Sequence, residues 1–169
     1  MTLIVCPLAE VETLAAERGP SHVLSLLGPA LNPPACPDIA PERRLHLLFN
    51  DIIEPAEGLI LPNAEHIDEL ISFGRTWDRA APMLVHCWAG ISRSTAAAYI
   101  LACDRAGPGR EGLIAKRLRE ASAIATPNPL MIALADAALK RDGAMRAAIA
   151  RIGRGDIAEI GKPFDLSLD

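Results

Sequence analysis

The sequence has little of what marks several large protein classes. Aromatic residues make up 4% of the 169 residues, and no apolar run approaches the roughly 18 residues that a membrane-spanning helix needs. Lys and Arg number 17 against 21 Asp and Glu, for a net charge of −4, so neither nucleic acid nor membrane is expected as a partner. Residues 1–7 lack the basic start and long apolar stretch of a signal peptide, which favours a cytoplasmic location.

Cysteine and histidine are also sparse. Cys6, Cys36, Cys87 and Cys103 are too few for a disulfide framework, and no two of them have the C-x-x-C spacing of a zinc site. The histidines are scattered without metal-ligand spacing, so we expect no metal and no cofactor. Whether one of the other three thiols can reach Cys87 to form a reversible disulfide is a question of geometry that the sequence leaves open.

What the sequence does contain is a globular core. Half of the residues are hydrophobic and 22% are charged, which predicts a single folded domain over residues 1–169, with residues 153–169 as a C-terminal tail. Short apolar runs alternate with segments whose apolar residues recur at helical spacing. We therefore expect an α/β fold with a mixed, largely parallel sheet of four to five strands flanked by helices. The predicted strands are 2–6, 23–27, 44–49 and 83–86. The predicted helices are 8–18, one that opens at 62–63, 95–103, 113–124, 130–139 and 144–152.

One segment between a predicted strand and a predicted helix carries most of the chemistry. It reads His86-Cys87-Trp88-Ala89-Gly90-Ile91-Ser92-Arg93-Ser94. A tight loop that runs into a helix N-terminus turns unpaired backbone N–H groups toward one point, which predicts a cup for a tetrahedral anion. Residues 88–93 are therefore the predicted phosphate-binding residues, and the glycine lets the backbone curl without a steric penalty.

Cys87 and Arg93 have complementary roles in this cup. The guanidinium of Arg93 is a planar fork that fits two phosphoryl oxygens at once. The same positive surroundings favour the thiolate of Cys87, which makes it a nucleophile aimed at phosphorus. Ser94 is placed to donate to the Cys87 sulfur and stabilise it as a leaving group, and Ser92 is expected to help cap the helix. The ring of His86 is expected to point away from the cup and to bond the loop backbone.

The frame His-Cys-x5-Arg-Ser resembles the signature of the cysteine-dependent protein tyrosine phosphatase superfamily. The resemblance implies a phosphatase fold and hydrolysis of phosphomonoesters on protein side chains through a phosphocysteine. By order of elements it spans about residues 44–139, although only residues 86–94 form a strong motif. The Trp-Pro-Asp segment of the larger members is absent, and the alanine- and arginine-rich composition is typical of GC-rich bacterial genomes. The chain is therefore most similar to dual-specificity-like, bacterial-type members.

Members of this superfamily use a general acid on a separate upstream loop. Asp51, directly after a predicted strand, looks like this aspartate, with Glu54 and Asp38 as fallback candidates; a simple turn or cap role for Asp51 is the competing interpretation. Pro127-Asn128 looks like the segment that braces the phosphate loop in dual-specificity phosphatases. Asn128 is therefore expected either to bond that loop or to cap the following helix.

The side chains inside the loop indicate the substrate. Trp88, Ala89 and Ile91 are apolar, whereas superfamily members that act on inositol phosphates tend to place lysines there. A phosphorylated protein or peptide is thus the expected partner, with phosphotyrosine favoured and phosphoserine and phosphothreonine open. Two alternatives stay open: a module that binds phosphorylated residues without turnover, and a rhodanese-like sulfurtransferase, which also cradles an anion around a cysteine.

Overall fold

A computed structural model describes residues 2–168 as one sheet covered by helices on both faces. The five strands lie in the order β3-β2-β4-β1-β5. They are β1 (Thr2–Pro7), β2 (His22–Leu27), β3 (Arg44–Leu48), β4 (Met83–Cys87) and β5 (Phe164–Ser167). The pairs β1–β4, β4–β2 and β2–β3 are parallel, and β5 runs antiparallel along β1. The predicted mixed, largely parallel sheet is confirmed.

The three central strands, β2, β4 and β1, read as nearly continuous apolar runs because strands inside a parallel sheet are covered on both faces. Every residue of β2 and of β4 is buried. The register pairs Leu3 with Met83 and Pro7 with Cys87, so β1 and β4 end side by side. The loops that follow the parallel strands therefore leave from one edge of the sheet, which is where α/β folds build their sites.

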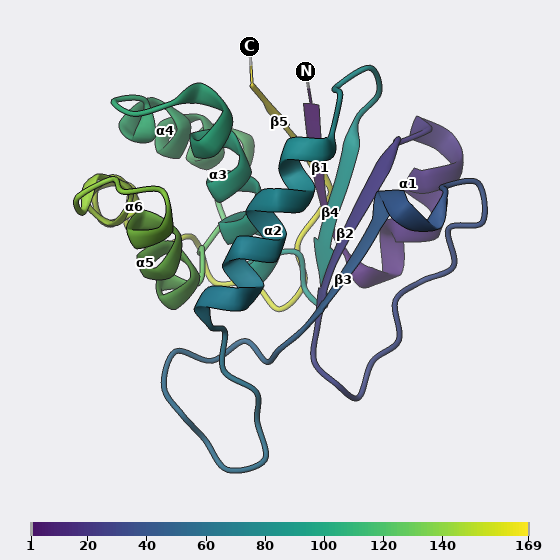
Figure 1. Ribbon diagram of the computed structural model, residues 1–169, viewed down its shortest axis with the longest axis horizontal. Helices are drawn as coiled ribbons and strands as arrows, with labels where there is room; N and C mark the ends of the chain where they lie inside the picture. Colours follow the sequence, from purple (N-terminus) through teal and green to yellow (C-terminus); the bar gives the residue numbers. More distant parts are fainter. Residues whose placement is uncertain (1, 169) are drawn as a thin grey trace.

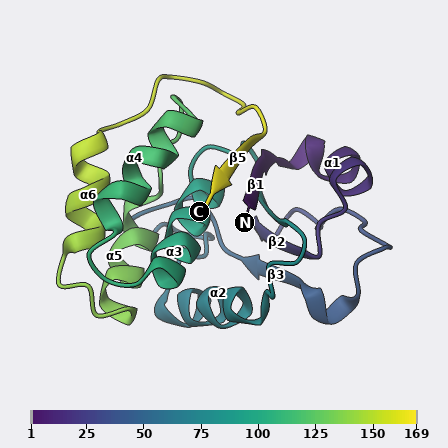
Figure 2. The same ribbon diagram turned by 90° about the horizontal axis from the view of Figure 1, so that it is seen from above.

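The helices are unequally divided between the two faces. They are η1 (Leu8–Glu10), α1 (Val11–Arg18), η2 (Pro41–Arg43), α2 (Ala64–Thr76), α3 (Arg93–Ala106), α4 (Glu111–Ala121), α5 (Pro129–Ala138) and α6 (Ala144–Ile152). Figure 1 shows α1 on one side of the sheet and α2 to α6 on the other, and Figure 2 shows the same division from above. None of the helices in residues 2–168 is long and apolar enough to cross a membrane.

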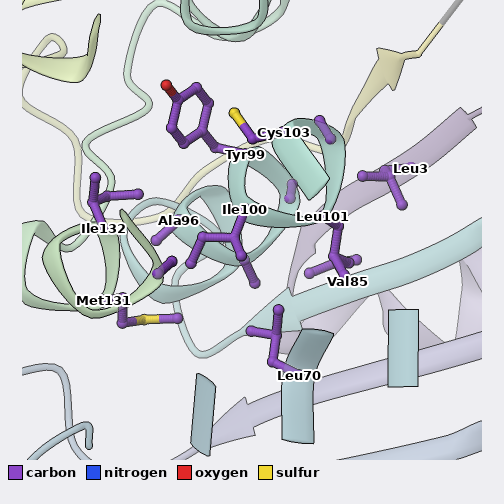
Figure 3. Packing of buried hydrophobic residues seen from close by; sticks show 14 of the residues in the cluster. Leu3, Leu70, Val85, Ala96, Tyr99, Ile100, Leu101, Cys103, Met131 and Ile132 are labelled. Carbon is purple, nitrogen blue, oxygen red and sulfur yellow. The ribbon is translucent and has the colours of Figure 1, made fainter. Parts of the chain in front are cut away.

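The core is built around α3. All residues from Arg93 to Cys103 are buried, as expected for a helix that is apolar on every side and enclosed by other elements. Figure 3 shows Ala96, Tyr99 and Ile100 of this helix among side chains of the sheet, α2 and α5. The Tyr99 hydroxyl donates to the carbonyl oxygen of Glu111 at 3.2 Å, so its polar end is satisfied inside the core. The helix that begins at the anion loop is thereby fixed in place.

The segment expected to form a tail is part of the sheet and of the loop region. Residues 164–167 form β5 and pair with β1 from Thr2–Ser167 to Val5–Phe164. Leu166 is 1% exposed and joins the main core. Residues 153–163 run from α6 past the end of β4 to reach this strand, so the C-terminal segment lies against the candidate site.

Candidate active site

Cys87 is the last residue of β4, and α3 begins six residues later at Arg93. The sulfur is buried, with the residue 1% exposed, and two groups of the loop contact it. The N–H of Gly90 donates to Cys87 Sγ at 3.2 Å. The Ser94 hydroxyl lies 3.2 Å from Sγ, the distance at which it can donate to the sulfur. The strand, loop and helix thus surround one thiol with hydrogen-bond donors.

The carbonyl oxygens of the loop are held by groups outside it. Three backbone N–H groups donate to them: Leu8 to Trp88 at 3.1 Å, Gly161 to Ala89 at 2.7 Å, and Thr126 to Ile91 at 3.0 Å. The Thr95 hydroxyl adds bonds to the carbonyls of Ile91 and Ser92. Because the C=O and N–H of a trans peptide point in opposite directions, these bonds turn the following amides toward the inside of the loop. The Gly90 amide, which follows the bound carbonyl of Ala89, donates to the Cys87 sulfur in this way.

Gly90 occupies a position that only glycine fits well. Its φ is +72°, in the left-handed region. A Cβ atom there would lie 2.7 Å from the backbone nitrogen of Pro7 and 2.8 Å from the carbonyl carbon of Cys6. The loop therefore packs directly on the backbone of β1, and this contact sets how closely the loop approaches the sheet.

Arg93 is held at the mouth of the cup with donor capacity to spare. The residue is 7% exposed, and one of its terminal nitrogens donates to the Phe49 carbonyl at 2.8 Å. Its Nε is buried and has no hydrogen-bond partner among the described residues. Nε lies 3.9 Å from the nearer Asp51 oxygen, too far for a hydrogen bond. A buried, unpaired N–H on a guanidinium is a donor that a bound oxyanion would satisfy.

Asp51 lies opposite the loop and is oriented by two side chains. Its Oδ1 accepts from the Ser92 hydroxyl at 2.8 Å and from Asn128 Nδ2 at 2.9 Å. Ser92 is the N-cap residue of α3, at the expected position, but its hydroxyl donates to the carboxylate and makes no cap hydrogen bond. The Asp51 side chain is 36% exposed, so solvent and a substrate can reach it.

Asn128 combines the two roles that the sequence left as alternatives. Its Oδ1 accepts from the N–H groups of Leu130 and Met131 and caps α5, and its Nδ2 reaches Asp51. Its backbone N–H donates to the Ser92 carbonyl at 3.4 Å, so the loop contact runs through the main chain and not through the amide side chain. One residue, 2% exposed, thus connects α5, the Asp51 loop and the anion loop.

His86 lies behind the cup, on the sheet side. Its Nε2 is 2.6 Å from the Ser25 hydroxyl of β2. The ring thus bonds the neighbouring strand through Ser25, and an interaction with the backbone of Cys87, where the loop begins, partly offsets the effect of burial on its pKa. Burial lowers the pKa of His86 from 6.5 to about 4, so the ring is neutral near neutral pH. Because the ring is neutral, it adds no charge of its own to the strand below the loop.

The alternative acids lie in different places. Glu54 is on the same loop as Asp51, and both line a groove of about 670 Å³ that also contacts Ile91 and Ser92. The C-terminal segment also lines this groove, through Arg154, Asp156, Ile157 and Ala158, of which Ile157 is 98% exposed. Asp38 lies instead with Cys36 in a separate cavity beside α1, away from the loop.

All four cysteines are free and buried. Cys6 and Cys36 belong to the cluster under α1, whereas Cys87 belongs to the main core on the other side of the sheet. Cys103 lies near the far end of α3. Cys103 is nonetheless part of the same main core as Cys87. Cys6 lies close enough to Cys87 for the two thiols to interact: burial, with a smaller contribution from Cys87, raises the pKa of Cys6 to about 12.

Several groups that shape the site could not be found from the sequence. Leu8, Gly161 and Thr126 act through backbone N–H groups, which every residue except proline carries. Ser25 and the Phe49 carbonyl likewise have no distinctive local pattern. Of these, only Gly161 offers a signal: a Cβ there would lie 3.0 Å from the Ala89 oxygen, so glycine permits the close approach.

Comparison with known proteins agrees with this geometry at the level of the fold. No protein-family model matches the sequence, and no curated protein sequence matches it. Among solved structures, the chain is similar to the crystal structure of DUSP15, a dual-specificity phosphatase, with a TM-score of 0.62 and 22% sequence identity. The similarity covers 89% of this chain and 92% of that one. The chain therefore has the fold of a dual-specificity phosphatase.

Proposed function

We propose that the protein is a phosphatase that hydrolyses phosphomonoesters on protein side chains through a phosphocysteine intermediate. The observation that carries the proposal is the loop around Cys87, whose carbonyl oxygens are bound from outside while the Gly90 N–H donates to Sγ. The inward-facing amides and the unpaired Nε of Arg93 supply hydrogen-bond donors and positive charge for a phosphoryl group. Cys87 supplies the nucleophile at the base of the loop.

The first step transfers the phosphoryl group to sulfur. The Cys87 thiolate attacks phosphorus, the S–P bond forms, and the bond from phosphorus to the ester oxygen breaks. Asp51, protonated, gives its proton to the departing oxygen, so an alcohol or phenol leaves. The loop amides and Arg93 stabilise the charge on the three remaining oxygens while it is transferred.

The second step returns the enzyme to its starting state. Asp51, now a carboxylate, removes a proton from a water that attacks phosphorus, and the P–S bond breaks to release inorganic phosphate. The sulfur leaves as a thiolate, which the Ser94 hydroxyl at 3.2 Å and the Gly90 N–H stabilise. Ser92 and Asn128 keep Asp51 facing the loop in both steps.

The surroundings of the loop favour phosphotyrosine on a protein. Cys87 is 1% exposed and lies at the base of the site, so a long phosphorylated side chain reaches it most easily. Trp88 is 52% exposed at the entrance, where an aromatic ring can pack on it. The adjoining groove is lined by Ile53 and Ile157 among others, and its described carboxylates, Asp51, Glu54 and Asp156, outnumber its one described cation, Arg154; this charge balance suits a peptide better than a polyanion.

The test compares substrates and two variants. We expect hydrolysis of an aryl phosphate and of phosphotyrosine peptides, with lower kcat/KM on phosphoserine peptides and on phosphoinositides. Cys87→Ser abolishes turnover but retains peptide binding, and Asp51→Asn slows turnover by about a hundredfold or more.

The outcomes separate the alternatives. Binding of phosphopeptide without turnover by the unchanged protein would identify a binding module. Formation of thiocyanate from thiosulfate and cyanide, with no phosphatase activity, would identify a sulfurtransferase. Substantial aryl phosphatase activity in Cys87→Ser would refute the mechanism.

A further inference from the structure

A second cavity, of about 340 Å³, lies at the far end of α3 from the anion loop. Four arginines contribute to its lining: Arg79, Arg105, Arg110 and Arg117. They come from the turn before β4, the last turn of α3, the residue before α4 and the middle of α4. Because α3 has 14 residues, its two ends are separated by roughly 20 Å. The cavity is therefore distinct from the Cys87 site.

No carboxylate within residues 2–168 forms an ion pair with the arginines of this cavity. Three carboxylates on α3 and α4, those of Asp104, Glu111 and Glu120, form ion pairs with Arg75, Arg141 and Lys116. Of the residues from 2 to 168, none with a carboxylate lines the cavity. The side chains of Arg79, Arg110 and Arg117 have no hydrogen bond or ion pair with any residue in the described part of the chain. This concentration of cations stands out in a protein with a net charge of −4.

The guanidinium of Arg105 is already held in place in the protein without a ligand. A terminal nitrogen of Arg105 donates to the carbonyl oxygens of Gly74 and Trp77, at 2.8 and 2.7 Å. These bonds hold the guanidinium at the cavity, and its other N–H groups make no hydrogen bond with any residue from 2 to 168. A pre-positioned fork loses less conformational entropy on binding an oxyanion than a free side chain does.

The rest of the lining indicates what accompanies the anion. Ile114 is nearly buried, whereas Leu113 is 43% exposed, and both lie beside Leu168. Apolar side chains next to arginines suit a phosphate carried on a carbon chain or ring better than a free inorganic ion. The lining holds no cysteine and no histidine, so it offers no phosphatase nucleophile or base.

We propose that this arginine cavity is a non-catalytic binding site for a phosphorylated side chain of a protein, with phosphotyrosine as the best fit. Arg110 and Arg117 bind the phosphoryl oxygens together with Arg105, and the leucines and isoleucine contact the ring. The phosphate stays on its carrier because no group in the cavity attacks phosphorus. The site does not depend on the phosphatase activity proposed for Cys87.

Amide NMR spectra of the Cys87→Ser protein, titrated with phenyl phosphate and with a phosphotyrosine peptide, test the site directly. We expect shifts at residues 110–114 and 167–168 that saturate independently of those at residues 88–93. Arg110→Gln with Arg117→Gln raises the Kd of the cavity at least about tenfold and leaves the titration of the loop unchanged. The matched control, Arg146→Gln with Arg151→Gln on α6, removes the same charge and leaves both Kd values unchanged.

Three results would overturn the proposal. The first is the absence of shifts at residues 110–114 at concentrations that saturate the loop. The second is equal weakening by the control pair, which would indicate net charge and not a site. The third is equally tight binding of the same peptide with glutamate in place of phosphotyrosine, which would make the cavity a general acidic-peptide site. Loss of the loop shifts alone would count against the proposed phosphatase and not against the cavity.

Discussion

The amide side chain of Asn128 bonds two parts of the site: its nitrogen bonds Asp51, the proposed general acid, and its oxygen bonds the start of α5. Its Oδ1 accepts from two N–H groups of the first turn, at 3.0 and 3.1 Å, and its Nδ2 donates to Asp51 at 2.9 Å. Asn128→Ala removes both connections. Asn128→Ser keeps a hydroxyl that can cap the helix but is too short to donate to Asp51. The two variants therefore separate the cap from the orientation of the acid.

The expected magnitudes differ for the two roles. Loss of an N-cap costs about 1 kcal/mol of stability. Loss of the hydrogen bond to the partly exposed Asp51 carboxylate adds about 1 kcal/mol. Asn128→Ala should thus lose about 2 kcal/mol and Asn128→Ser about half of that. Both variants should lower kcat by about tenfold, because the general acid keeps its chemistry but loses its orientation.

Urea unfolding gives the stabilities, and kcat on two aryl phosphates tests the role of Asp51. Phenol needs protonation as it leaves more than the acidic p-nitrophenol does, so kcat should fall further on phenyl phosphate than on p-nitrophenyl phosphate. A purely structural role would lower both equally. Wild-type kcat in Asn128→Ser would refute the orientation of Asp51 by Asn128, and equal stability of the two variants would refute the cap.

Three further predictions concern the pH dependence of stability, the shape of the loop and the groove. Burial lowers the pKa of His86 from 6.5 to about 4, so between these pH values the unfolded chain binds more protons than the folded one. The free energy of unfolding should therefore fall by about 2 kcal/mol from pH 7 to pH 5 because of this residue. His86→Gln should remove this difference in urea titrations. Gly90→Ala would place a Cβ at a φ of +72° and in a clash with β1, so it should weaken inhibition by vanadate at least about tenfold. The control is Gly109→Ala, which has a φ of +86° but no atom within 4 Å of the added Cβ, and it should leave the inhibition unchanged. Ile157→Asp should raise KM for a phosphotyrosine peptide about tenfold without changing kinetics on phenyl phosphate, since only a peptide extends along the groove; equal effects on both substrates would contradict a role in peptide binding.

The sheet and most helices follow from local pattern. Buried parallel strands are continuous apolar runs, and the Gly19-Pro20 and Gly107-Pro108 pairs mark helix ends at the residues where α1 and α3 stop. The strand β5 could not be predicted because it has four residues and only Leu166 is buried. Its pairing with β1 depends on contacts between the two ends of the chain, which no local pattern encodes.

The candidate site likewise has a part that could be predicted from the sequence and a part that could not. The loop from Cys87 to Ser94 could be predicted because its nucleophile, glycine, arginine and helix start are contiguous in the sequence. The partners that shape the loop could not, because they act through backbone N–H groups brought in from distant segments. Ser92 and His86 illustrate the limit: each lies where expected, but tertiary contacts with Asp51 and Ser25 decide what its side chain bonds.

Trapping of the phosphoryl group on Cys87 is the most direct test of the proposed chemistry. Asp51→Asn protein is mixed with ³²P-labelled p-nitrophenyl phosphate, whose leaving group needs little protonation, and is quenched in acid before peptide mapping. The label should appear on the single peptide that contains Cys87 and should be absent from Cys87→Ser protein treated in the same way. Label on any other residue, or turnover that persists in Cys87→Ser, would contradict a phosphocysteine intermediate.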